Sequence, residues 1–107
     1  MYKSRKRAKA GLPGTPIADC VKAGMNVALG TDGATDCGNL DMFEVMRFAA
    51  ADERRAGGDP SGMPAAAVLM MATTCGARAQ NRASQAGMLK EGMDADIVLV
   101  DFSAPHL

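Results

Sequence analysis

The chain has 107 residues, enough for one small domain but too few for a complete (β/α)8 barrel, which takes about 250 residues. Its hydrophobic content of 48% argues against intrinsic disorder. Nine methionines, four aromatic residues and no tryptophan predict a core of small and flexible side chains. Twelve basic and twelve acidic residues leave no net charge.

The positive charge is concentrated at the start of the chain, where five of the twelve basic residues lie in the first nine positions. Such a run could contact nucleic acid or another anionic surface. No aromatic or recognition-helix pattern accompanies it, so we interpret it as a solvated terminus and expect no nucleic-acid partner. Residues 1–15, basic and then rich in glycine and proline, are expected to form an extended lead-in.

The first predicted elements lead to a short polar turn. Residues 16–23 are expected to form a helix with Thr15 as its N-cap, and the apolar residues 25–29 a short strand. Residues 30–33, Gly-Thr-Asp-Gly, then require a sharp turn, since glycine adopts dihedral angles that other residues avoid. Chemistry in parallel α/β folds collects at the carboxyl ends of strands, so Asp32 is a candidate metal or substrate ligand. A carboxylate that only stabilises the turn is the alternative.

Two helices and two strands are expected in the rest of the chain. Asp41 and Glu44 have the spacing of a capping box, which begins a helix that runs to about Arg55. Another helix is expected over residues 64–79. Residues 87–92 are expected to form a short strand and turn, and the β-branched run at 95–102 has the pattern of a buried strand.

Two separated parts of the sequence carry a family resemblance. The first is AGMNVALGTDG at residues 23–33 with NLDMFEVMR at 39–47. The second is MATTCGA at 71–77, followed by GMLKEGMDADIVLVD at 87–101 and APHL at 104–107. Together they resemble the amidohydrolase superfamily, and most of all its chlorohydrolases and methylthioadenosine/S-adenosylhomocysteine deaminases.

The resemblance implies an α/β fold that is part of a larger one. Members of the superfamily are (β/α)8 barrels with a small flanking β-domain. By that resemblance, residues 16–86 would be a barrel fragment, with residues 25–29 as the last strand and helices beside it. Residues 87–107 would be strands of a partial β-domain.

The resemblance also implies a metal site. Family members hold a divalent metal, zinc or iron, with histidines that follow the first, fifth and sixth strands and an aspartate that follows the eighth. Asp32 matches that aspartate, which would contact the metal and shuttle a proton from its water. The single histidine, His106, lies in β-domain-like sequence, and a catalytic zinc site usually needs three protein ligands. We therefore expect no stoichiometric metal in this chain alone. Cys37 could bind zinc in an oligomer, but an idle thiol is the simpler interpretation.

Three functions follow as hypotheses. In the first, the chain is a truncated piece of a metal-dependent hydrolase that acts on carbon–nitrogen bonds (deamination) or carbon–chlorine bonds of heterocycles, and is inactive alone. In the second, it is a non-catalytic homo-oligomeric binding module. In the third, it completes an active site in trans with a chain that carries the histidines.

The expected partners and location follow from simple features. In this chain alone, residues 25–29 would lack both neighbouring strands of a barrel, so we expect a homo-oligomer that forms through exposed strand edges. Three cysteines without CxxC spacing, and no recognisable signal peptide, indicate a cytoplasmic setting. The apolar runs at 65–72 and 97–100 are too short to span a membrane.

Overall fold

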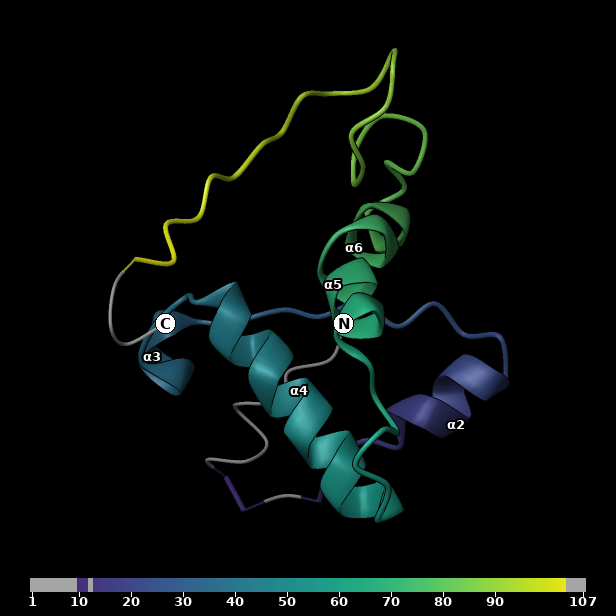
Figure 1. Ribbon diagram of the computed structural model, residues 1–107, viewed down its shortest axis with the longest axis vertical. Helices are drawn as coiled ribbons and strands as arrows, with labels where there is room; N and C mark the ends of the chain where they lie inside the picture. The colour runs from purple at the N-terminus through teal and green to yellow at the C-terminus, as the bar shows by residue number, and fades with distance from the viewer. Residues whose placement is uncertain (1–9, 12, 104–107) are drawn as a thin grey trace.

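The computed structural model describes residues 10–11 and 13–103, with the side chains of residues 36 and 37 left out (Figure 1). Most of the basic lead-in (residues 1–9) and His106 therefore lie outside the described residues. Within them the helices are α2 (Ile17–Lys22), α3 (Ala34–Cys37), α4 (Met42–Gly57), α5 (Ala65–Ala72) and α6 (Thr74–Ala79). None of the helices in this part of the chain is long and apolar enough to cross a membrane.

Helix α2 confirms the predicted helix, but the predicted N-cap is wrong. Pro16 occupies the cap position and makes no side-chain cap hydrogen bond. Instead the N–H groups of Ile17 and Ala18 donate to Oε2 and Oε1 of Glu53, both at 3.1 Å. Glu53 belongs to α4 and is only 9% exposed. A buried carboxylate on a neighbouring helix thus satisfies the first N–H groups of α2, a task that a local side chain usually performs.

Helix α4 begins as predicted at Asp41, whose Oδ1 accepts from the N–H groups of Phe43 at 2.8 Å and Glu44 at 3.2 Å. The reciprocal half of the capping box is replaced by Asn39. Its Oδ1 accepts from the Asp41 N–H at 3.1 Å, and its Nδ2 donates to Glu44 Oε2 at 2.9 Å. The helix ends where Gly58 adopts a φ of +64°, a left-handed conformation that glycine tolerates.

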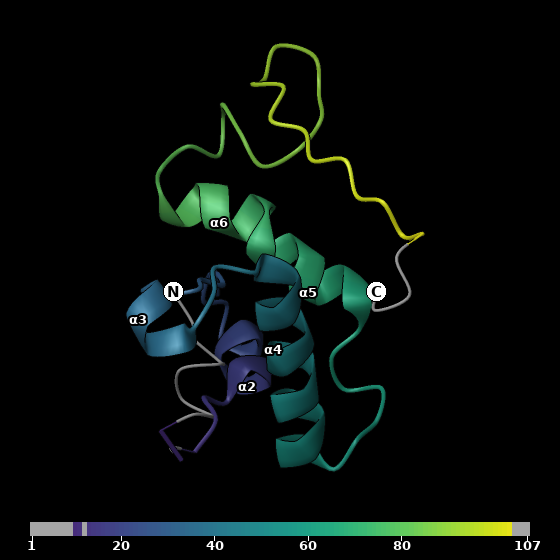
Figure 2. The same ribbon diagram turned by 90° about the vertical axis from the view of Figure 1, so that its left-hand side faces the viewer.

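The single helix predicted over residues 64–79 is wrong, because the structure breaks it at Thr73 into α5 and α6 (Figure 2). Thr73 has φ −118° and ψ −90°, outside the helical region. The hydroxyls of Thr73 and Thr74 donate to the carbonyls of Leu69 at 2.8 Å and Met70 at 3.3 Å. Such bonds back to the preceding turn bend helices, and two in succession accompany the break.

The described residues form no strand beyond a single bridge position at Leu29, so the strands predicted at 25–29, 87–92 and 95–102 and the partial β-domain are not confirmed. Residues 95–102 form an extended arc that runs from above α6 back toward the start of α4 (Figure 1), and Val100 and Phe102 line an open pocket beside α4 and α5. In this part of the chain no backbone–backbone hydrogen bond joins them to another segment. A strand needs a neighbour for its N–H and C=O groups, and no other described segment supplies backbone partners to these residues.

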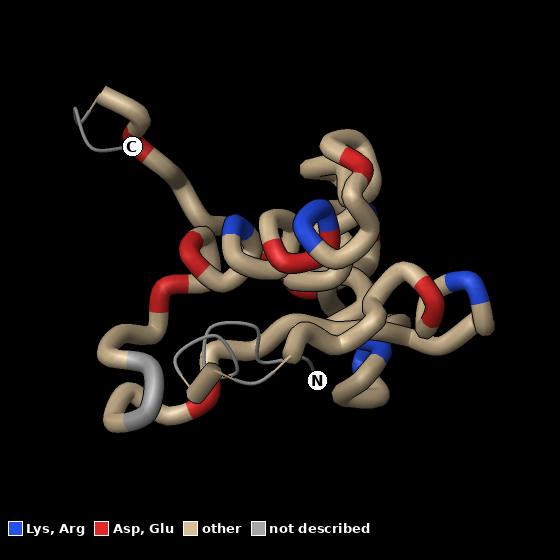
Figure 3. The backbone as a smooth tube through the Cα atoms, turned by 90° about the horizontal axis from the view of Figure 1, so that it is seen from below, with Lys and Arg blue, Asp and Glu red and all other residues tan. Residues whose placement is uncertain are grey.

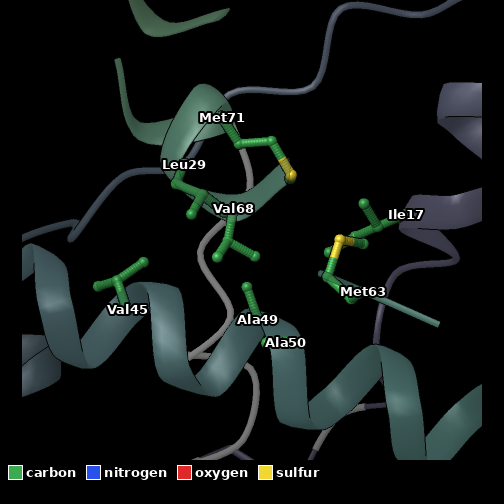
Figure 4. Close-up of a cluster of buried hydrophobic side chains, with 8 residues drawn as sticks. All are labelled: Ile17, Leu29, Val45, Ala49, Ala50, Met63, Val68 and Met71. Carbon is green, nitrogen blue, oxygen red and sulfur yellow. The ribbon is translucent and has the colours of Figure 1, made fainter. Parts of the chain in front are cut away.

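The core lies between α4 and α5 and is closed by α2 and by the end of the extended segment 25–29 (Figure 4). It contains no aromatic residue, in agreement with the prediction of small and flexible core side chains. Its members are Ile17, Leu29, Val45, Ala49, Ala50, Met63, Val68 and Met71. This core therefore packs the residues just before Asp32 against two helices.

Charged residues of both signs are spread over the described backbone (Figure 3). Among the ion pairs of the described residues, two join residues three positions apart, Asp19 with Lys22 and Asp52 with Arg55. The third, Arg82 with Asp94 at 2.9 Å, closes the loop that follows α6, together with a bond from the Asp94 N–H to the Gln85 carbonyl at 2.7 Å. Exposed pairs of this kind contribute about 0–1 kcal/mol each, so they shape loops more than they stabilise the fold.

Candidate active site

Asp32 lies at the turn between the extended segment and α3, as the sequence predicts. The turn itself is unusual, because the positive φ falls on Asp32, at +64°, and on neither of the flanking glycines. Aspartate is among the few residues that tolerate this left-handed conformation, although it is less favourable than an ordinary one. The Thr31 hydroxyl donates to the Asp32 carbonyl at 3.1 Å. The local backbone thus holds the carboxylate in a specific, mildly strained orientation.

The Asp32 carboxylate is only partly accessible. Its Oδ2 atom is buried, and the residue interacts with other groups of the protein. Asp32 also lines an open cleft of about 790 Å³, whose walls include Leu29, Met42, Thr73 and Arg82. A buried carboxylate oxygen beside such a cleft is a suitable hard ligand for a divalent cation and a suitable proton acceptor.

A complete metal site is not assembled by the described residues, which contain no group of three or more His, Cys, Asp and Glu side chains placed to hold an ion. The cleft has three further charged side chains: Arg82 and Asp94, which are paired with each other and about half exposed, and Asp96, which is exposed. The backbone of Cys37 ends α3, while its side chain and His106 lie outside the described residues. Among the described residues the cleft therefore offers the partly buried carboxylate of Asp32, whose oxygen chemistry would suit a divalent metal, but no further ligands placed around one ion.

Two residues that position this region were missed by the sequence analysis. Glu53 holds α2, and the side chain of Asn26 donates to the Cys75 carbonyl at 3.0 Å. A signal for Glu53 was present, since it follows Val45 and Ala49 at intervals of four, on the buried face of α4. No local pattern marks Asn26, because its partner is 49 positions away.

With this geometry in place, the family can be identified. The profile of the amidohydrolase family matches residues 9–107, and the chain belongs to this family. The resemblance seen in the sequence is thereby confirmed.

Three individual relatives that the chain resembles are deaminases. Over 92 residues, 86% of this chain, it is 45% identical to a 5'-deoxyadenosine deaminase of Methanosarcina mazei and 46% identical to a 5-methylthioadenosine/S-adenosylhomocysteine deaminase of Moorella thermoacetica. Over its full 107 residues it is 38% identical to the latter type of deaminase from Caldanaerobacter subterraneus. The matched residues cover 21%, 22% and 25% of these relatives, so the chain spans about a fifth to a quarter of their length.

A comparison with solved structures also finds a deaminase. The crystal structure of an adenosine deaminase from Xanthomonas campestris with bound zinc superposes with a TM-score of 0.89 at 34% identity. The match covers 95% of this chain and 23% of that one. The helices and the segment that carries Asp32 are therefore arranged as a fragment of a barrel-type amidohydrolase.

Proposed function

We propose that this chain supplies the carboxylate of Asp32 to the active site of a metal-dependent deaminase that acts on adenine nucleosides. The observation that carries the proposal is the buried Oδ2 atom of Asp32 beside the cleft, in a chain of the amidohydrolase family. The relatives' names support deamination over carbon–chlorine hydrolysis, because those compared above are all deaminases. Adenine nucleosides are the compounds that these names share.

The proposed reaction replaces an exocyclic amino group of the purine by an oxygen from water, with release of ammonia. Asp32 would accept a proton from the attacking water and return it to the departing nitrogen, which is general base and then general acid catalysis. A divalent metal, when bound, would act as a Lewis acid and lower the pKa of that water. The backbone at Asp32 and the packed core beneath it would keep the carboxylate oriented for both transfers.

We propose further that the chain is not catalytic by itself. A zinc or iron site needs several ligands in one geometry, and Asp32 is a single ligand. The other ligands would be histidines on the remainder of a barrel, which could precede these residues in one polypeptide or belong to a complementing chain.

A graft tests this proposal. The residues of this chain that match the Moorella thermoacetica deaminase would replace the corresponding segment of that enzyme. We expect the graft to deaminate methylthioadenosine, while the 107-residue chain alone shows neither turnover nor stoichiometric metal. The Asp32→Asn graft should lose turnover, whereas the control Asp19→Asn, at an exposed position of α2, should keep it. A folded, metal-loaded Asp32→Asn graft that works as well as the unsubstituted graft would contradict the proposal.

A second candidate, association between copies, is supported by the apolar segment 97–100. Ile97, Val98 and Leu99 are 60%, 80% and 94% exposed, an unusual state for three consecutive large apolar side chains. We propose that two copies associate through this segment. Light scattering should then give more than the monomer mass for the 107-residue chain and a lower mass for Leu99→Lys. A monomer in both cases would exclude it.

A further inference from the structure

The segment that leads to Asp32 is tied at two points to the helices α5 and α6. The Leu29 N–H donates to the Met71 carbonyl at 3.0 Å, and the Asn26 Nδ2 donates to the Cys75 carbonyl at 3.0 Å. The two acceptors lie on opposite sides of the helix break at Thr73. The extended segment is therefore attached across the break and not along one regular helix.

The break explains how the first of these bonds is possible. A helix that continued through Thr73 would use the Met71 carbonyl for the N–H of residue 75. With the helix ending at Ala72 and restarting at Thr74, the Met71 carbonyl accepts the Leu29 N–H. The break thus bends the helical region and also provides a hydrogen-bond acceptor for the segment that leads to Asp32.

The break is also braced by the chain that follows α6. Gly87 has a φ of +95°, and a Cβ atom there would lie 2.8 Å from the Ala77 Cβ and 3.2 Å from the Thr73 carbonyl oxygen. Only a residue without a side chain fits this close approach. Gly87 thus packs closely against the break from which the Asp32 segment is held.

The spacing of these two hydrogen bonds along the segment suggests that Asn26 affects the position of the Asp32 carboxylate. Leu29 lies midway between Asn26 and Asp32 in the sequence, so its N–H bond acts as a pivot. Without the Asn26 bond the segment could rotate about Leu29 and shift Asp32, which lies on the other side of that pivot. We propose that Asn26 is a positioning residue that sets the orientation of the Asp32 carboxylate. This inference rests on the role proposed above for Asp32.

The first test uses the 107-residue chain and needs no activity. Asn26→Asp keeps the shape of the side chain but loses its N–H donor, whereas Asn26→Gln keeps a donor. Asn81→Asp, on the exposed turn after α6, is the matched control. By NMR we expect Asn26→Asp to speed amide exchange at Leu29 and to move the Asp32 carboxyl resonance, with neither change in the control. Unchanged signals in a folded Asn26→Asp chain would overturn the inference.

The second test uses the deaminase graft and separates the two proposals. A displaced carboxylate should lower kcat by roughly tenfold or more, with little change in KM, because a small misplacement slows chemistry more than binding. Asn26→Gln should recover most of the loss. An equal loss in Asn26→Gln would overturn the positioning role, since its donor is retained. A graft that tolerates Asp32→Asn would instead refute the proposed function, and the exchange at Leu29 would still decide whether Asn26 holds the segment.

Discussion

Two apolar segments that were both predicted to be strands differ in how far their side chains are buried. Residues 25–29 end in the core, where Ala28 is 1% and Leu29 is 5% exposed. Residues 97–99 are largely exposed, with Leu99 at 94%, and Val100 is 37% exposed. Residues 97–100 are all branched aliphatic and residues 25–29 include only two such residues, so the more apolar segment is the exposed one and composition does not predict which is buried. The difference is that helices α4 and α5 bury the end of the first segment, whereas in the second Val100 only lines an open pocket beside these helices and residues 97–99 remain 60% or more exposed.

This contrast shows that an apolar run predicts that a segment tends to be buried, but does not predict which other part of the protein buries it. The first segment is held by two carbonyls of the helical region, that of Met71, which accepts from the Leu29 N–H, and that of Cys75, which accepts from the Asn26 Nδ2. For the second, the matched relatives extend well beyond this chain, since it covers only about a fifth to a quarter of their length. Its partner would lie in such additional residues or in a second copy.

The largest expected effect compares the two segments directly. Leu29→Ala should lower the free energy of unfolding by about 3 kcal/mol, because it opens a cavity in the core. Leu99→Ala should change it by less than about 0.5 kcal/mol, as is usual for exposed positions. Urea unfolding followed by circular dichroism measures both. Equal losses would mean that residues 97–100 are buried in solution.

The bracing of the helix break can be tested with two glycines of similar backbone conformation. Gly87→Ala should destabilise the chain by about 3 kcal/mol, since it combines an unfavourable φ with a steric clash. Gly92, with a φ of +81°, has nothing within 4 Å of the place that a Cβ atom would take, so Gly92→Ala should cost only about 1 kcal/mol. The difference between the two losses of unfolding free energy measures the cost of the steric clash at residue 87. No difference would show that residue 87 does not pack on the break.

Removal of the Glu53 carboxylate should loosen α2. Glu53→Ala removes the acceptor of the part-buried Ala18 N–H and one of two acceptors of the Ile17 N–H, which also donates to the Thr15 carbonyl at 2.8 Å, so it should lower the free energy of unfolding by about 1–2 kcal/mol. Glu53→Gln keeps one acceptor oxygen and should fall between the alanine variant and the unsubstituted chain. Glu91→Ala, at an exposed position, is the control and should have almost no effect. Equal stability of all these variants would contradict the capping role of Glu53.

The smallest expected effect is a pH dependence at the turn between α4 and α5. The hydroxyl and the N–H of Ser61 donate to Asp59 Oδ1, and these bonds hold the pKa of the carboxyl below its ordinary 3.8. Their contribution is complete above that ordinary pKa and is lost as the pH falls through the lowered, folded-state pKa. The melting temperature should therefore fall slightly more on acidification than it does in Asp59→Asn. Identical acid profiles would contradict this.

Local signals were sufficient for some elements and insufficient for others. Helix α4 could be predicted because its cap, Asp41, and its apolar spacing are both local. The break at Thr73 could not, since the apolar spacing continues through it and the bonds at the break include one to Leu29. Likewise Thr15 was a reasonable N-cap for α2, but the acceptor came from Glu53 on another helix.

The candidate site likewise has features that could be predicted from the local sequence and others that could not. The position of Asp32 at a turn after an apolar segment was predictable from the Gly-Thr-Asp-Gly sequence. Its positive φ, the burial of Oδ2 and the tether through Asn26 were not, because they depend on residues distant in the sequence.

The role of Asp32 is tested most directly by the turnover of the Asp32→Asn deaminase graft, measured at equal metal content. We expect kcat to fall by roughly 10²–10⁴-fold relative to the Asp19→Asn control, the usual loss when a general acid–base group is removed. A kcat close to that of the control, with the metal still bound, would contradict the assignment of Asp32 as the proton-transferring carboxylate.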